Sequence, residues 1–170
     1  MSQVVAEHRA SSPQEVACAV ITVSDTRTLE TDTGGQLLCE LLAAAGFRVA
    51  AREIIADDPV LMRALVERFR DEPQVAAVLL TGGTGLSSRD QTFETLSGLF
   101  TKQLPGYGEL FRMLSYQEIG AAAMLSRACA GMVDGTAVFL MPGSTAAVRL
   151  AMDRLIIPEL GHLTKLAAKS

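Results

Sequence analysis

The sequence contains no tryptophan, and aromatic residues of all kinds make up only 5% of its 170 positions. Its core must therefore be built from aliphatic side chains and methionine, which the 49% share of hydrophobic residues can supply. A chain of this length can bury roughly 70% of its unfolded surface, so one domain needs no covalent staples. The mean hydropathy of +0.28 lies on the hydrophobic side for a soluble protein, which favours burial of some surface in a homo-oligomer.

Cysteine is also scarce. Cys18, Cys39 and Cys129 are scattered, odd in number and never spaced as CxxC, which argues against a disulfide framework or a zinc site and favours a reducing compartment. No apolar run reaches the roughly 20 residues that a membrane-spanning helix needs, and the start of the chain shows no apolar segment typical of a secretory signal. We therefore expect a soluble, cytoplasmic protein without a membrane partner.

Clusters of lysine and arginine are missing as well, and the formal net charge is −4 at pH 7. A nucleic-acid-binding surface would show as such a cluster, so we expect no nucleic-acid partner. An anionic small substrate stays possible, because a few arginines or backbone amides can hold one. Neither His8 nor His162, each near one end of the chain, suits catalysis, and no GxSxG sequence occurs, which argues against a Ser-His-Asp hydrolase.

Apolar runs alternate with amphipathic stretches along the chain. Runs that are apolar throughout predict buried strands at residues 16–25, 47–55, 74–80 and 136–143. Helical spacing predicts helices at residues 37–45, 59–69, 93–99, 110–127 and 144–156, with a loop at 102–109. Asp58 and Ser144 are predicted helix caps, and Pro158 is expected to interrupt the last helix.

This order of elements predicts a single three-layer α/β/α domain with a mostly parallel sheet, spanning residues 16–170. Residues 1–15 are expected to form a flexible N-terminal arm. In such folds ligands bind beyond the carboxyl ends of the strands. The segments "SDTR", "ADD", "TGGTGLSSRD" and "MPGS" would meet there.

The glycine-rich segment has two interpretations. Gly82, Gly83 and Gly85 would let the backbone approach an anion closely with its N–H groups, or they would form a turn that only links a strand to a helix. A dinucleotide fingerprint is excluded because Ser88 stands where the third glycine is needed. A P-loop is excluded because the chain has no Gly-Lys-Ser or Gly-Lys-Thr triplet.

The aspartates near this segment are ambiguous in the same way. Asp90 could cap the helix near Phe93, with Arg89 balancing its charge, or it could face a metal ion or a reacting phosphate. Asp58 precedes Pro59 and is assigned to capping, which leaves Asp57 free at the same rim as Asp90. Two carboxylates and a glycine cradle are more typical of a magnesium–nucleotide site than of a hydrolase triad.

Several segments in a fixed order resemble the MoaB/MogA family of molybdenum cofactor biosynthesis proteins, namely "TVSDTR", "TDTGG", "LLTGGTGLSSRD", "PGYGELFRMLSYQEIG", "MLSRACAG" and "VFLMPGST". The likeness covers nearly all of the chain from about Val16 and looks closest to the B branch. It implies a molybdopterin-binding fold, also found in gephyrin-like proteins, and a trimer or dimer of trimers. It further implies MgATP-dependent adenylylation of molybdopterin with release of pyrophosphate, and other proteins of the pathway are possible partners.

The resemblance also implies site residues, matched position by position. Asp90 matches the family's essential aspartate, and Asp57 matches a second acidic position, so both are candidate catalytic residues and Mg²⁺ ligands. The implied substrate-binding residues are Ser24, Asp25, Asp32, Gly34, Thr81, Gly82, Gly83, Thr84, Gly85, Gly106, Glu109, Ser126, Pro142, Gly143 and Ser144.

Three functions stay open at this point. The first is a molybdopterin adenylyltransferase, and the second is a non-catalytic molybdopterin carrier or assembly protein of the same pathway. The third is a nucleotide-pyrophosphate hydrolase, since competence-damage-type proteins carry a related domain. Such proteins usually have a long second domain, which we do not expect in 170 residues.

Overall fold

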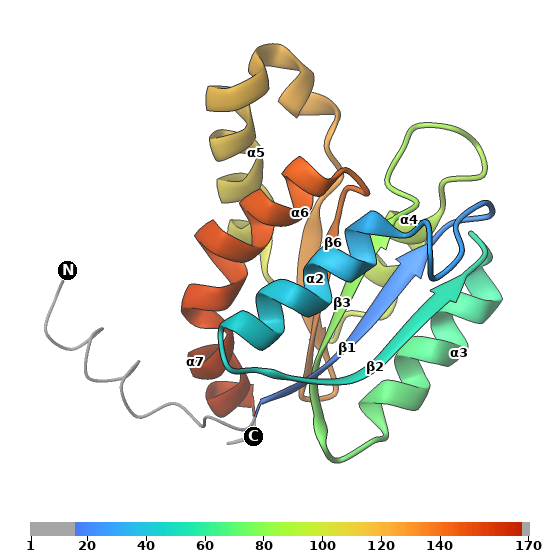
Figure 1. Cartoon of the computed structure of the whole chain (residues 1–170), viewed down its shortest axis with the longest axis vertical. Coiled ribbons are helices and arrows are strands. Elements are labelled where there is room, and N and C mark those ends of the chain that lie inside the picture. The colour runs from blue at the N-terminus through green and yellow to red at the C-terminus, as the bar shows by residue number, and fades with distance from the viewer. Residues whose placement is uncertain (1–15, 168–170) are drawn as a thin grey trace, which may run out of the picture.

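The computed structural model describes residues 16–167 and is built around one six-stranded sheet (Figure 1). The expected arm at residues 1–15 lies outside the described residues. The strands are β1 (Ala17–Val23), β2 (Arg48–Ile55), β3 (Val75–Gly82), β4 (Lys102–Gln103), β5 (Cys129–Val133) and β6 (Thr136–Met141). They lie in the order β2-β1-β3-β6-β5-β4. The first four in this order run parallel, and β5 pairs antiparallel with both of its neighbours, so the expected mostly parallel sheet is confirmed.

Helices cover both faces of the sheet. They are α2 (Thr33–Ala44), α3 (Pro59–Arg70), α4 (Thr92–Ser97), α5 (Pro105–Ile119), the 3₁₀ segment η1 (Gly120–Leu125), α6 (Thr145–Ala151), the π-helical segment η2 (Met152–Ile156) and α7 (Ile157–Ala167). α2, α5, α6 and α7 lie on one face, and α3 and α4 lie on the other (Figure 1). None of the described helices is long and apolar enough to span a membrane.

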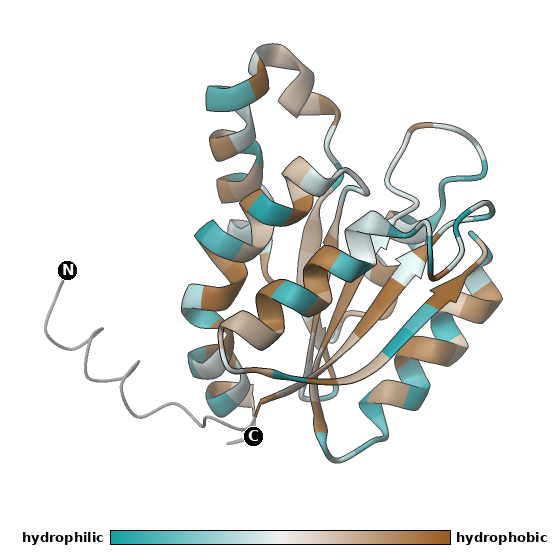
Figure 2. Ribbon diagram, in the orientation of Figure 1, coloured by the Kyte–Doolittle hydropathy of each residue, from teal (hydrophilic) through white to brown (hydrophobic). Residues whose placement is uncertain are grey.

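The two faces of β1 explain why its sequence is apolar throughout. Cys18 and Val20 belong to the core under α2, whereas Ala19 and Ile21 belong to the core under α3. All four are fully buried. The central strands are accordingly hydrophobic along their length, while the covering helices carry hydrophilic residues between apolar ones (Figure 2). The three-layer α/β/α prediction is confirmed.

The antiparallel part of the sheet was missed by the sequence prediction, which placed one strand at residues 136–143. β5 and β6 form a hairpin across Asp134 and Gly135, whose φ angles are +46° and +95°. An Asp-Gly pair with both φ angles positive is the usual two-residue hairpin turn. The signal "VDGT" was therefore present in the sequence.

Three helix boundaries also differ from the prediction. α2 begins at Thr33 rather than residue 37, because Asp32 caps it. A loop was expected at Pro105, but α5 begins there. Proline suits the first helical position because it has no N–H to leave unpaired. Pro158 does not interrupt the last helix, because the π-helical turn η2 lies just before it and the helix continues in α7. The predicted caps Asp58 and Ser144 are confirmed.

Candidate active site

The segments that follow β1, β2, β3 and β6 meet at one rim of the sheet. Ser24 donates its N–H to the carbonyl of Ile55 at 2.8 Å, which joins the ends of β1 and β2. The hydroxyl of Thr81 donates to the carbonyl of Pro142 at 3.2 Å, which joins β3 to the segment before α6. Gly34 completes the rim from the first turn of α2, since a Cβ on it would lie 3.3 Å from the carbonyl oxygen of Gly143.

Two glycines at the end of β3 cannot be replaced without displacement of their neighbours. Gly82 has a φ of +101°, and a Cβ there would lie 2.2 Å from the carbonyl oxygen of Val23. Gly83 has a φ of +61°, and a Cβ there would lie 1.9 Å from Oγ1 of Thr92 and 2.7 Å from Oδ2 of Asp57. The chain therefore leaves β3 in direct contact with an acidic side chain, and only glycine fits.

Asp57 lies half-buried in this contact region. Its N–H donates to Oδ1 of Asp25 at 3.2 Å, and its own Oδ1 accepts the N–H of Gln91 at 3.3 Å. Burial raises the pKa of Asp57, and the charges of Asp90 and Asp25 raise it further, while the Gln91 N–H and Arg127 oppose this rise. The structure therefore groups Asp25, Asp57 and Asp90 closely enough for their charges to interact.

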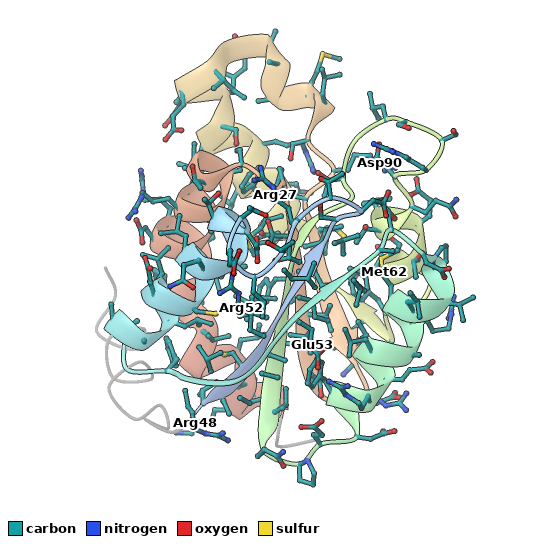
Figure 3. All side chains as sticks on the ribbon, turned by 45° about the vertical axis from the view of Figure 1, so that its right-hand side comes forward. Arg27, Arg48, Arg52, Glu53, Met62 and Asp90 are labelled. Carbon is teal, nitrogen blue, oxygen red and sulfur yellow. The ribbon has the colours of Figure 1, made fainter. Side chains whose placement is uncertain are left out.

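Asp90 closes the segment between β3 and α4 on itself. Its Oδ2 accepts the N–H of Ser87 at 3.0 Å, and a Cβ on Gly85 would lie 2.7 Å from the same oxygen. The alternative that Asp90 caps α4 is wrong, because the cap position is Gln91 and has no side-chain cap bond. Arg89 was expected to balance Asp90, but its Nη1 lies 3.9 Å from Oδ2 of Asp25. Figure 3 shows Asp90 on this segment at the rim.

Asp32 is held differently from the other acidic rim residues. Its carboxylate accepts hydrogen bonds from the hydroxyl of Thr22 at 2.8 Å, from the N–H of Gly35 at 2.9 Å and from Nη2 of Arg52 at 3.0 Å. Only 3% of Asp32 is exposed. The side chain thus caps α2 and fixes the first helical turn, where Gly34 lies.

The remaining candidate residues lie at the two ends of α5 and its extension. Gly106 and Glu109 are exposed in the first turns of α5, and Glu109 lines a cavity of about 370 Å³ between α4, α5 and β5. Ser126 follows η1, and its hydroxyl accepts the N–H of Ala128 at 3.4 Å. Ser126 precedes Arg127, which reaches the glycine-rich segment, but the bond of the Ser126 hydroxyl is to Ala128 and not to a rim residue.

Arg127 was not singled out from the sequence. Its Nε donates to the carbonyl of Thr84 at 3.1 Å, and its Nη2 donates to the carbonyl of Asp90 at 2.7 Å. Its Nη1 is paired with Glu94. These partners lie 33 to 43 residues away in the sequence, so no local spacing could have shown them. The arginine of "MLSRACAG" in the family resemblance was the only available signal.

Comparison with known proteins agrees with this arrangement. Residues 19–162 match the family described as a probable molybdopterin binding domain. The chain is 54% identical over 163 residues to molybdenum cofactor biosynthesis protein B of Bacillus subtilis strain 168, covering 95% of each chain. The chain belongs to the MoaB family of molybdenum cofactor biosynthesis proteins. Another MoaB-family relative, from Halalkalibacterium halodurans, is 48% identical over 95% of each chain.

Solved structures of the MoaB family have the same fold. A crystal structure of molybdenum cofactor biosynthesis protein B superposes with a TM-score of 0.91 at 50% identity, covering 94% of this chain and all of the other. The tungsten cofactor synthesizing protein MoaB from Pyrococcus furiosus gives a TM-score of 0.80 at 35% identity, covering 92% and 99%. The family assignment and the molybdopterin-binding fold are therefore confirmed.

Proposed function

We propose that this MoaB-family protein binds molybdopterin and adenylylates it with MgATP, giving adenylyl-molybdopterin and pyrophosphate. The observation that carries the proposal is the contact between the glycine-rich segment and two carboxylates. A Cβ on Gly83 would meet Asp57, and a Cβ on Gly85 would meet Asp90, so each glycine lies against one aspartate. A backbone that can approach phosphates beside two acidic groups suits phosphoryl-type transfer better than covalent catalysis.

The proposed substrate contacts are mostly backbone amides and small side chains at the rim. Backbone N–H groups of the glycine-rich segment can donate to phosphate oxygens. The proposed substrate-binding residues are those that the family resemblance implies. Asp32 is included through its effect on the first turn of α2, because its carboxylate already accepts three hydrogen bonds within the protein.

The acidic rim residues fit a magnesium ion. No group of three or more His, Cys, Asp or Glu side chains within residues 16–167 is arranged as a complete protein metal site. Mg²⁺ commonly takes one or two carboxylates and completes its shell with water and substrate phosphate. Asp57 and Asp90 would hold it, because a cation would offset the like charges that, besides burial, raise the pKa of Asp57. When bound, Mg²⁺ offsets negative charge on the phosphates.

The proposed transfer needs no nucleophile from the protein. An oxygen of the molybdopterin phosphate forms a new bond to the α-phosphorus of ATP, and the bond from that phosphorus to the bridging oxygen of the β-phosphate breaks. Pyrophosphate leaves with the electron pair. The role of the rim is to hold the two phosphates in line and to keep the glycine-rich backbone against them.

A non-catalytic molybdopterin carrier is the second candidate. The observation that favours it is that Asp57 and Asp90 each accept a backbone N–H, from Gln91 and Ser87 respectively. Both aspartates would then be retained because they shape the loop, with or without chemistry.

Pyrophosphate release from MgATP, measured with and without molybdopterin, distinguishes the two functions. We expect release that requires molybdopterin and is lost in Asp90→Ala, with the variant still folded by circular dichroism. Absence of release by the wild-type protein, together with molybdopterin binding in calorimetry, would contradict the adenylyltransferase and favour the carrier. Asp153→Ala is the matched control, since Asp153 lies in η2 and pairs with Arg149.

We also propose that the protein is a cytoplasmic homo-oligomer, a trimer or a dimer of trimers. The outward side of α5 and η1 carries large apolar side chains that are 47–77% exposed, namely Leu110, Met113, Tyr116, Ile119, Met124 and Leu125. Apolar groups gathered over one helix and its extension are typical of a surface covered by a partner. Light scattering at several concentrations should give a mass above the 18.0 kDa of one chain. A monomer at all concentrations would contradict this assignment.

A further inference from the structure

The segment from Thr84 to Asp90 needs a partner outside itself to keep one geometry. It belongs to no helix or strand, and residues 85–89 are exposed. Its internal bonds join Ser87 to Asp90 in both directions, through the Asp90 N–H and the Asp90 carboxylate. These bonds close the segment, and its contacts with Asp25 through Arg89 (3.9 Å) and with the Gln91 side chain through the Ser88 carbonyl (3.4 Å) are long and exposed.

Arg127 supplies that attachment from the far side of the rim. One guanidinium group donates to the carbonyls of both Thr84 and Asp90, which are the two ends of the segment. The same group pairs with Glu94 of α4, and its carbon lies 5.5 Å from the centre of the Phe93 ring, within the range of a cation–π contact. The Arg127 side chain is only 19% exposed, so its bonds to the two carbonyls are partly shielded from water, whereas its partner Glu94 is 59% exposed.

The position of Arg127 in the chain links it closely to the sheet. It lies two residues before β5, which is hydrogen-bonded to β6 in the sheet. The planar guanidinium can bond two carbonyls at fixed positions, whereas the ammonium of lysine is a single point of charge. Arginine at this place therefore couples the ends of the segment to each other and to the sheet.

We propose that Arg127 is a positioning residue that holds Thr84–Asp90, and with it the Asp90 carboxylate, in the geometry needed for substrate, and that Glu94 orients Arg127. The kinetic part of this proposal rests on the proposed adenylyl transfer, whereas the structural part does not. Arg127 acts through the backbone of the segment and needs no contact with the reacting atoms.

The test compares Arg127→Lys with Arg68→Lys. Arg68 is a matched control, because it also pairs with a glutamate, Glu53 at 2.7 Å, and lies 4.4 Å from the ring centre of Phe69, but on α3. Amide hydrogen exchange is measured by mass spectrometry, and kcat and KM for MgATP are measured by pyrophosphate release with molybdopterin present. Exchange reports on opening of the segment even if no turnover occurs.

We expect exchange of the hydrogen-bonded Ser87 and Asp90 amides within residues 84–90 to become about tenfold faster in Arg127→Lys, and kcat to fall about tenfold or more while KM for MgATP changes less than about twofold. Glu94→Gln should also speed exchange of residues 84–90 and lower kcat, but by less than Arg127→Lys. If Arg127→Lys fails to fold, Glu94→Gln replaces it in the test. Arg68→Lys should change neither. Unchanged exchange of residues 84–90 in both rim variants would overturn the proposal, as would faster exchange with an unaltered kcat. Absence of turnover in the wild-type protein with faster exchange in the variants would refute the adenylyl transfer and uphold the anchoring role.

Discussion

Asp32 and Asp57 lie in neighbouring regions of the same rim, yet their surroundings are opposite. Asp32 is 3% exposed and accepts hydrogen bonds from a hydroxyl, a backbone N–H and the guanidinium of Arg52. Asp57 accepts one backbone N–H and faces the like charges of Asp90 and Asp25. A carboxylate whose partners all come from the protein stabilises the fold. A carboxylate left among other carboxylates gains most when a cation or a substrate arrives.

The difference shows that charge and position in the chain do not by themselves assign a role. Asp57 was a rim candidate because it follows a predicted strand and matches the family pattern, whereas Asp32 was a candidate through the family resemblance alone. The decisive partner of Asp32 is Arg52, twenty residues away on β2. Asp57 has no comparable cation within ion-pair distance among residues 16–167.

The largest expected effect is on stability, in Asp32→Ala. The substitution removes the cap of α2 and leaves Arg52 half-buried without its carboxylate, which should lower the free energy of unfolding by about 3 kcal/mol. For a chain of this size the melting temperature should fall by roughly 10 °C. Thermal melting followed by circular dichroism measures it. Asp32→Asn keeps a capping oxygen, so its melting temperature should lie between those of wild type and Asp32→Ala. A melting temperature of Asp32→Ala equal to that of wild type would contradict the structural role.

The next effect is on turnover, in Asp57→Asn. The variant keeps the size of the side chain and an oxygen that can accept the Gln91 N–H, but it removes the charge. Pyrophosphate release should fall about a hundredfold or more, the usual scale for loss of one electrostatic group at a reacting centre. The melting temperature should stay within a few degrees of wild type. Full activity would show that Asp57 serves only the loop.

A smaller effect is expected one residue further along, in Asp58→Ala. Asp58 accepts the N–H groups of Val60 and Leu61 at 2.7 and 3.2 Å and caps α3, but it has no buried cation partner among the described residues. Loss of the cap should lower the free energy of unfolding by about 1 kcal/mol, which urea unfolding can measure. A loss as large as that of Asp32→Ala would show that the ion pair with Arg52 contributes little.

The smallest effect concerns pH. Because the pKa of Asp57 is raised in the folded state, the folded protein binds this proton more tightly than the unfolded chain. The contribution to stability is therefore present at low pH and is lost as pH rises through the folded pKa. In metal-free buffer, Asp57→Asn should gain stability relative to wild type as pH rises from about 4 to about 7. Urea unfolding across this interval checks it, and added Mg²⁺ should reduce the difference.

The sequence was sufficient for elements whose signals are local. The apolar run of β1 and the pair Asp58–Pro59 predicted a buried strand and a helix start, and both were confirmed. The Asp134–Gly135 pair was also a local signal, but it was not used to predict the hairpin between β5 and β6. Arg127 and Arg52 could not be predicted, because their partners are distant in the chain and only the completed sheet brings them together. The family resemblance named candidate residues of the rim, but it did not show which of them form hydrogen bonds or ion pairs with one another.

The π-helical turn η2 has a geometrical consequence for the end of the chain. Val148, Met152, Ile156, Leu160 and Thr164 are all buried and recur at a strict interval of four residues. In an uninterrupted α-helix this stripe would wind about 160° around the axis over sixteen residues and would turn away from the sheet. The wider π turn winds fewer degrees per residue and so takes up part of that rotation. The π turn therefore corrects the rotation of the buried stripe, so that the continuous helix α6–η2–α7 keeps its apolar side facing the core up to its last described turns.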